Sequence, residues 1–192
     1  MSADRLDLAA RIAAATAEDT VRGLAFNAAF EVVRQHADEP TVLICDPAAK
    51  GKRADLSSYP VPELLQVIWA VADRLERTVG SVEEVFFRIG RRNTAGLLRS
   101  MLGYTRLGFG RSPKALLSNV PAAFKAATGS GQRFVTWEGE TACRIDFERE
   151  FLPLAYLRGT IQAVLDAARK ETASVEGSVP AFMKATFRVR WE

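Results

Sequence analysis

The chain has 192 residues, of which 48% are hydrophobic and 26% charged, and its net charge is +3. This composition excludes a disordered chain and predicts one soluble globular domain. Apolar runs stay far short of the roughly 18 residues that cross a bilayer, and the amphipathic N-terminus contains acids, unlike a secretory signal. The two cysteines, Cys45 and Cys143, show no metal-binding spacing and fit a reducing compartment, so we expect a cytoplasmic protein.

The charge is unevenly distributed along the chain. No Asp or Glu lies between Val85 and Trp137, whereas this segment holds nine basic residues and leaves the rest of the chain net acidic. We call residues 85–137 the basic segment. Its cations are Arg88, Arg91, Arg92, Arg99, Arg106, Arg111, Lys114, Lys125 and Arg133. Such clustering favours an anionic ligand, partner or interface without identifying it.

The first 128 residues show mainly helical periodicity, with apolar residues recurring three and four positions apart. The expected helices cover residues 4–16, 19–37, 62–79 and 81–102. The proline of Asp38-Glu39-Pro40 ends the second helix, because the residue before a proline is disfavoured in helical conformation. Ser81 with Glu84 forms a capping box for the fourth. Residues 41–45 can form a helical turn or a short strand, and 46–58 a loop.

A change of period marks the last third of the chain. A glycine-rich loop over 103–112 leads into a helix from Pro113 and a short helix from Pro121. Beyond Gly131 the apolar residues alternate, which predicts strands. The expected strands cover 132–137, 141–147, 172–179 and 185–191, with a helix over 153–168 between the two pairs. We therefore expect an α+β fold in a single domain 1–192. A mainly helical part, 1–128, packs on a four-stranded antiparallel sheet of β-β-α-β-β order in 129–192.

Seven short segments, spread over nearly the whole chain, carry a further signal. They are Asp19–Asn27 (DTVRGLAFN), Ser58–Val61 (SYPV), Ile89–Arg91, Gly131–Arg133, Phe151–Pro153, Tyr156 with Gly159, and Trp191. In this order they resemble a myxobacterial paralogous family that is related to the haem-nitric-oxide-binding (H-NOX) and four-vinyl-reductase sensor domains. The resemblance implies helices packed on a four-stranded antiparallel sheet, which together can enclose a ligand cavity. It implies no enzymatic activity.

The chain departs from the haem-binding relatives at the positions that hold haem. Those relatives use a proximal histidine on a helix ahead of the sheet and a Tyr-x-Ser-x-Arg pattern for the propionates. Here the one histidine, His36, ends an early helix, and Leu116 to Phe124 contains none. No Tyr-x-Ser-x-Arg occurs, and the second strand ends in Phe147-Glu-Arg-Glu150. Because haem iron needs an axial donor, we predict no haem, and no other cofactor or metal.

Six arginines are candidates for an anion or partner surface. They are Arg88, Arg91, Arg92, Arg99, Arg106 and Arg111. Arg88, Arg92 and Arg99 of the expected helix fall within about 40° on a helical wheel. Arg106 and Arg111 lie in the loop just ahead of a helix N-terminus, which can bind anions. The loop lacks the Gly-Lys-Ser/Thr of a phosphate-binding P-loop. The alternatives are a solvated face whose arginines pair with acids from elsewhere, and a plain glycine-rich connection.

Six aromatic residues are candidates to line an apolar cavity. They are Phe26, Phe30, Trp69, Phe86, Phe124 and Tyr156. In an enclosed fold such residues can surround a small hydrophobic ligand. Aromatic residues at helical spacing also form plain core, and this alternative stays open at each position.

No catalytic constellation is recognisable in the sequence. His36, Cys45 and Asp46 are close along the chain, but nucleophilic catalysis needs side chains within hydrogen-bonding reach of one another. We interpret them as a helix-end histidine and a small buried cysteine. Cys143 falls on the inner face of a strand, so we expect it in the core.

We therefore expect a non-enzymatic sensor or adaptor domain that can bind a small apolar ligand and signal through a protein partner. The alternative is an anion-dependent module that binds nucleic acid, an acidic protein or membrane headgroups through the basic segment. The identity of the ligand and partner, and the oligomeric state, do not follow from the sequence.

Overall fold

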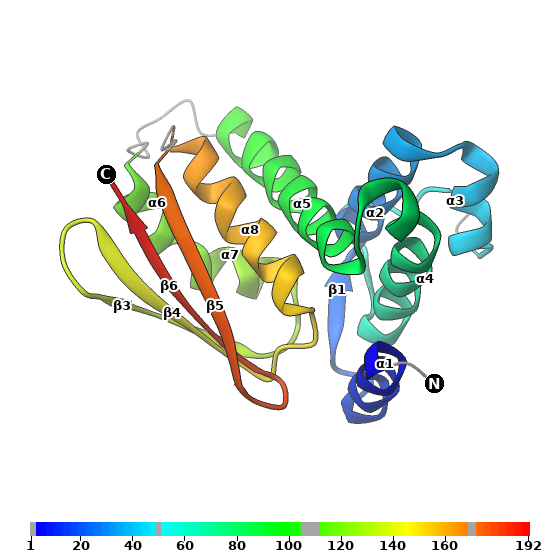
Figure 1. The fold of residues 1–192 in the computed structure, drawn as a ribbon, viewed down its shortest axis with the longest axis horizontal. Helices are drawn as coiled ribbons and strands as arrows, with labels where there is room; N and C mark the ends of the chain where they lie inside the picture. Colours follow the sequence, from blue (N-terminus) through cyan, green and yellow to red (C-terminus); the bar gives the residue numbers. More distant parts are fainter. Residues whose placement is uncertain (1–2, 49–50, 105–111, 169–171) are drawn as a thin grey trace.

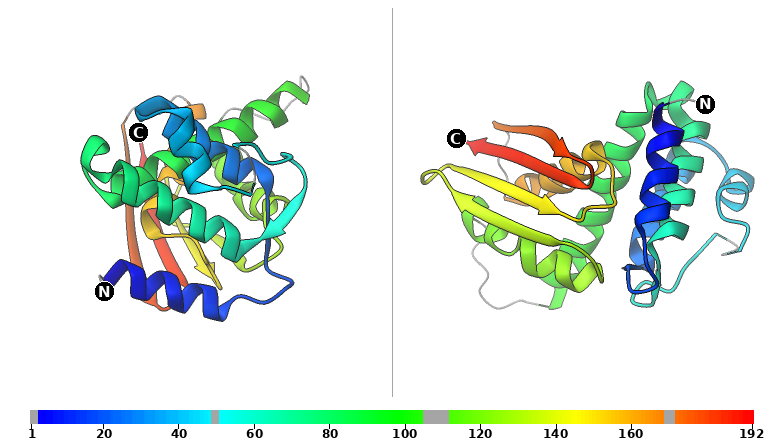
Figure 2. Two further views of the ribbon diagram at one scale, coloured as in Figure 1. Left: turned by 90° about the vertical axis from the view of Figure 1, so that its right-hand side faces the viewer. Right: turned by 90° about the horizontal axis from the view of Figure 1, so that it is seen from below.

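The computed structural model describes residues 3–48, 51–104, 112–168 and 172–192, of which the side chains of 3–6 and 99–104 are left out. It has an α+β architecture in three layers: a group of N-terminal helices, a pair of long central helices, and a sheet with short helices beside it (Figure 1). Figure 2 shows the sheet and the N-terminal helices on opposite sides of the central pair. Within the described part of the chain, no helix combines the length and hydropathy needed to span a membrane.

Helices dominate the first two layers. The N-terminal layer contains α1 (Ala3–Ala14), α2 (Gly23–His36), α3 (Glu39–Cys45) and α4 (Val61–Val79). The central pair consists of α5 (Val82–Tyr104) and α8 (Leu154–Ala167), which share the most extensive contact between any two described elements. The α5–α8 contact is close because two glycines face the opposite backbone: a Cβ on Gly90 would lie 2.0 Å from the Tyr156 carbonyl oxygen, and one on Gly159 2.0 Å from that of Phe87.

The four-stranded sheet is antiparallel with the order β3-β4-β6-β5. Its strands are β3 (Gln132–Trp137), β4 (Ala142–Glu148), β5 (Ala173–Ala181) and β6 (Lys184–Trp191). Alternate residues such as Cys143, Ile145 and Phe147 are buried toward α8, as the two-residue period predicts. The short helices α6 (Pro113–Ser118) and α7 (Val120–Ala127) lie beside α8 on the same face (Figure 1). The fold class and the β-β-α-β-β order are thus confirmed.

The structure corrects one predicted boundary and decides an assignment that the sequence left open. The helix expected over 19–37 begins at Gly23, because Thr20–Arg22 forms a strand, β1, that pairs antiparallel with β2 (Ser58–Pro60) in the expected loop. Residues 41–45 belong to the helix α3, which Asp38 caps by accepting the Thr41 N–H at 3.0 Å. At Ser81 only half of the capping box forms: its hydroxyl accepts the Glu84 N–H, while the Glu84 carboxylate binds Arg88.

The loop after α3 closes over the start of α2. The N–H groups of Gly23 and Leu24 donate to the carbonyl oxygens of Ser57 and Asp55, at 3.0 and 3.1 Å, which satisfies two of the free donors at the helix N-terminus. A Cβ on Gly23 would lie 2.2 Å from the carbonyl oxygen of Ala54, so only glycine allows this approach. The Asn27 amide also donates to the Arg53 carbonyl oxygen at 2.7 Å. Part of the Asp19–Asn27 segment therefore positions a loop.

The connection between β4 and α8 ties the N-terminal layer to the sheet. Arg11 of α1 donates to the carbonyl oxygen of Glu150 at 3.1 Å, and Arg149 donates to the Asp19 carboxylate at 2.7 Å. Burial raises the pKa of Asp19, but the hydrogen bonds from Arg149 and Thr16 outweigh burial and hold this pKa below its ordinary value. The contact with Arg149 therefore favours an ionised Asp19.

Candidate ligand cavity

A cavity of about 520 Å³ lies between the N-terminal layer, the central helices and the short helix α7. Five segments of the chain supply its walls: the β1–α2 junction, the loop at residues 55–56, α5, α6 with α7, and one face of α8 with the residue Leu152 ahead of it. This volume falls in the usual range for sites that bind small molecules. The cavity thus forms where segments that are distant in the sequence meet.

Helical spacing explains which side chains reach the cavity. On α8 the lining residues are Tyr156, Thr160 and Val164, spaced four apart and therefore on one face of the helix. On α7 they include Val120, Ala123, Phe124 and Ala127, which follow the same i, i+3, i+4, i+7 pattern. Most of the lining is aliphatic or aromatic, so the cavity favours an apolar occupant.

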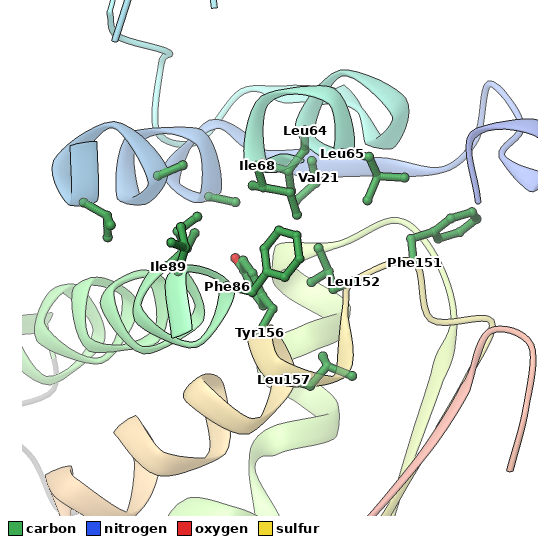
Figure 3. Close-up of a cluster of buried hydrophobic side chains, with 14 of the residues drawn as sticks. Val21, Leu64, Leu65, Ile68, Phe86, Ile89, Phe151, Leu152, Tyr156 and Leu157 are labelled. Carbon is green, nitrogen blue, oxygen red and sulfur yellow. The ribbon is translucent and has the colours of Figure 1, made fainter. Parts of the chain in front are cut away.

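Two buried hydroxyl groups on α8 stand out among the polar groups of this mostly apolar lining. Tyr156 is 1% exposed and Thr160 5% exposed, and neither hydroxyl oxygen makes a hydrogen bond of normal geometry, although the Asn93 side chain lies close enough to the Tyr156 phenol to act on it. Figure 3 shows Tyr156 extending from α8 into the space beside Phe86 and Ile89 of α5. Burial raises the pKa of the Tyr156 phenol well above its ordinary value, while the neighbouring Asn93 amide acts in the opposite direction. The phenol is therefore neutral and can donate a hydrogen bond.

Two charged residues are among those that line the cavity, Arg22 and Asp55. The Arg22 guanidinium donates to the carbonyl oxygens of Leu56 at 2.7 Å and Ala126 at 3.3 Å. The Asp55 carboxylate accepts from the Asn27 amide at 2.6 Å. Both side chains thus have partners within the protein. Leu56 also lines the cavity although it is 82% exposed, which places an exposed apolar side chain at its edge.

A polar groove of about 440 Å³ adjoins the cavity. Leu24, Asp55 and Asn93 line both hollows. The charged residues of the groove include Glu31 and Arg92, which form an ion pair with each other, and Arg34, which binds Glu39 at 2.7 Å. These charges are satisfied within the protein, so the apolar cavity is the stronger candidate site.

The described lining of the cavity offers no usual axial donor for haem iron. The helices α6 and α7, which precede the sheet, contribute Leu116, Val120, Ala123 and Phe124, and the described lining contains no His, Cys or Met. Tyr156 is the one phenol there, and its raised pKa opposes the phenolate that would bind iron. His36 lies outside the lining, with its Nε2 3.0 Å from Nη1 of Arg88. Among the described residues, no cluster of His, Cys, Asp and Glu could hold a metal ion either.

The described arginines of the candidate anion surface have partners within the protein. Arg88 binds Glu84 at 2.8 Å, Arg91 binds Asp166 at 2.8 Å, and Arg92 binds Glu31. The side chain of Arg99, and the residues Arg106 and Arg111 with most of their glycine-rich loop, lie outside the described part. Ion pairs on a surface are individually weak, so these contacts neither require nor prevent an external anion. The anion surface stays a prediction.

The structure separates the six aromatic residues proposed for a cavity. Phe124 and Tyr156 line it. The other four, Phe26, Phe30, Trp69 and Phe86, lie outside the lining, in the core between the N-terminal layer and α5. Trp69 and Phe86 pack with their ring centroids 4.8 Å apart, and Phe26 packs against Tyr59 at 5.4 Å. These four therefore belong to the hydrophobic core and not to the cavity wall.

The three residues weighed as a catalytic group each have another role. His36 contacts Arg88, and Asp46 binds Arg53 at 2.9 Å. Cys45 is buried, and burial raises the pKa of its thiol more than the Arg74 charge lowers it. Burial likewise raises the pKa of Cys143 to about 11. Neither cysteine is therefore an activated thiolate.

Sequence reasoning missed most of the lining residues. Thr160 carried a usable signal, because it is a polar residue on the apolar stripe of α8 between Tyr156 and Val164. The apolar face of α7 was a second signal, since small residues such as Ala123 and Ala127 leave space beside a helix. Val21, Leu24 and Leu97 carried none, because each looks like ordinary core in the sequence.

Comparison with solved structures places the fold among H-NOX proteins. An Fe(II) unliganded H-NOX protein from K. algicida superposes with a TM-score of 0.73 at 10% identity, covering 89% of this chain and 96% of that one. A mutant of T. tengcongensis H-NOX gives 0.69 at 15% identity, covering 89% and 97%. An oxygen-binding H-NOX domain related to soluble guanylate cyclases, in its oxygen complex, gives 0.63 at 16% identity, covering 89% and 95%. At these identities the likeness establishes the fold alone.

Sequence comparison adds a family. No curated protein sequence matches the chain significantly. A family model described as protein of unknown function (DUF2378) matches residues 14–192, which is nearly the whole chain. The chain therefore belongs to the DUF2378 family and has the H-NOX fold.

Proposed function

We propose that this protein is a non-enzymatic sensor or adaptor domain that holds a small apolar molecule in the cavity, without haem, and signals by contact with a protein partner. The observation that carries the proposal is the cavity of about 520 Å³, with walls that are mostly apolar and contain no axial donor for iron among the described residues. Its fold is that of H-NOX proteins, one of which binds oxygen. The ligand here differs in kind, because the described lining favours apolar contact over coordination.

Apolar burial can supply the affinity for such a ligand. Removing about 200 Å² of ligand surface from water contributes about 5 kcal/mol before the cost of immobilisation. The walls lie on helices that pack tightly elsewhere, so much of the site is formed before binding. An elongated apolar molecule would contact α5, α7 and α8 together, which connects the ligand to the central pair of helices.

The basic segment is the second candidate for the functional site. Arg88, Arg91 and Arg92 each pair with a carboxylate of the same chain. Binding of nucleic acid, an acidic protein or membrane headgroups would have to compete with these pairs. The anion-binding module is therefore the second proposal.

The first prediction concerns filling of the cavity. We expect the fluorescent hydrocarbon diphenylhexatriene to bind the wild-type protein, and Ala123→Trp to weaken this binding at least about tenfold, because the indole would occupy the space beside α7. Ala122→Trp is the matched control: Ala122 is exposed on the same helix and does not line the cavity. Fluorescence titration measures both variants. If Ala123→Trp does not fold, Ala127→Trp, which would fill a neighbouring part of the cavity, replaces it in this test.

Two results would contradict the proposed cavity. Diphenylhexatriene that fails to bind the folded wild-type protein would exclude an apolar site of this size. Equal binding by the Ala122 and Ala123 variants would place the dye elsewhere on the molecule.

The second prediction concerns haem. When hemin is titrated into the protein, we expect the Soret band of free hemin to persist, because the described lining offers no imidazole, thiolate or thioether to iron. Absorption spectra recorded beside a haem-free globin check this result. A stoichiometric, shifted Soret band would show that a donor outside the described lining binds the iron.

A further inference from the structure

The two buried hydroxyls of the cavity are the strongest unexplained feature of the molecule. Tyr156 and Thr160 lie one helical turn apart on α8 and both line the cavity; neither hydroxyl oxygen makes a hydrogen bond of normal geometry, and only the Tyr156 phenol has a polar side chain nearby, that of Asn93. Buried polar groups in native proteins are nearly always paired, because an unpaired group loses its bonds to water without replacement. Two such groups one helical turn apart in a mostly apolar wall therefore point to a partner that binds there.

The surrounding backbone leaves the Thr160 hydroxyl free. A threonine inside a helix commonly bonds the carbonyl oxygen four residues earlier, which here belongs to Tyr156. Gly90 of α5 packs directly over this carbonyl, since a Cβ at Gly90 would lie 2.0 Å from its oxygen. The close α5–α8 contact thus covers the usual acceptor of Thr160, and the hydroxyl remains without a partner.

The charges around the cavity select against an anionic ligand. Arg22 already binds the carbonyl oxygens of Leu56 and Ala126, and Asp55 contributes a carboxylate on the same lining. An anionic headgroup would therefore meet one engaged cation and one like charge among the described lining residues. A neutral oxygen, in contrast, can accept from the phenol of Tyr156 and exchange a hydrogen bond with the hydroxyl of Thr160.

We propose that the ligand is an uncharged, largely hydrocarbon molecule with one oxygen, an alcohol or a ketone, which pairs with the hydroxyls of Tyr156 and Thr160. This inference rests on the proposed function, because it assigns a ligand class to the same cavity. The hydrocarbon part occupies the walls of α5 and α7, and the oxygen is held at α8. The protein then selects ligands that carry this oxygen through two hydrogen bonds. In a buried environment, a ligand without the oxygen would leave both hydroxyls unpaired, which is costly.

The test compares three probes of equal chain length, decanol, decanone and decanoate, in displacing diphenylhexatriene at neutral pH. We expect decanol and decanone to displace the dye at concentrations about tenfold lower than decanoate. The double variant Tyr156→Phe, Thr160→Val preserves shape and removes both hydroxyls. It should bind the dye within about twofold of wild type and lose about tenfold in affinity for decanol and decanone.

A stability measurement gives an independent readout. Because neither hydroxyl makes a hydrogen bond of normal geometry in the ligand-free protein, the double variant should melt about 2–4 °C higher than wild type when no ligand is present. A lower melting temperature would show that the hydroxyls are already satisfied, and it would overturn the inference.

Binding of the dye distinguishes failure of the proposed function from failure of the assigned ligand class. If diphenylhexatriene does not bind, the proposed function fails and this inference fails with it. If the dye binds but decanoate displaces it as well as decanol does, or if the double variant binds decanol like wild type, the cavity stands and the assigned ligand class is wrong.

Discussion

Replacing Arg133 with Met is expected to lower the free energy of unfolding by about 3–5 kcal/mol. Arg133 and Glu150 form an ion pair at 2.6 Å, with side chains only 3% and 4% exposed. The guanidinium also lies over the Phe124 ring, 4.7 Å from its centroid. Without Arg133 the Glu150 carboxylate would be buried without its ion-pair partner, which is far more costly than the loss of a surface pair. Urea denaturation at fixed pH measures the change.

Two further variants separate charge burial from lost packing. Arg133→Met combined with Glu150→Gln should recover most of the lost stability, because the amide is neutral and can still accept the Leu152 N–H at Oε1. Lys114→Met removes one partner of the exposed pair with Glu140 and should cost less than about 1 kcal/mol. A double variant as unstable as Arg133→Met alone would mean that packing, not the unpaired carboxylate, dominates.

Gly159→Ala and Gly90→Ala are expected to destabilise the protein by about 1–3 kcal/mol each, although alanine favours helices. At either position the new Cβ would lie 2.0 Å from a backbone carbonyl oxygen of the facing helix. Backbone cannot move aside as a flexible side chain can, so α5 and α8 must separate along their contact. Urea denaturation should report the loss.

Gly96→Ala provides the matched control on α5. A Cβ at Gly96 would have Leu24 Cδ1 as its nearest neighbour, at 3.9 Å, which is ordinary contact. This variant should therefore gain up to about 1 kcal/mol from helix propensity. If Gly90→Ala and Gly159→Ala also gained stability, the close approach of α5 and α8 would not require glycine at these two positions.

Elements with strong local patterns could be predicted from the sequence. The helix α4 combines a proline in its first turn, regular apolar spacing and a glycine stop, and it lies at Val61–Val79 where 62–79 was expected. The strands β3, β4 and β6 followed from the alternation of residues such as Phe187 and Val189. The ordered segments that resemble H-NOX relatives also pointed to the observed fold.

The short strands β1 and β2 could not be predicted in this way. Three residues at 20–22 pair with three at 58–60, and neither stretch is long enough to show a period. Val21 fitted the spacing of the following helix equally well. Residues 20–22 form a strand and not a helix because they pair with residues 58–60, which are distant in the sequence.

Local patterns in the chain were enough to predict the longer helices and strands, the α+β class and the concentration of positive charge, because each depends on residues that are near one another along the chain. The packing of distant elements was needed to show that Tyr156 and Thr160 meet Val120 and Leu24 around a cavity, and that Arg92 pairs with Glu31. A local pattern reports which face of a helix is apolar. It does not report which surface that face meets, or whether the two surfaces fill the space between them.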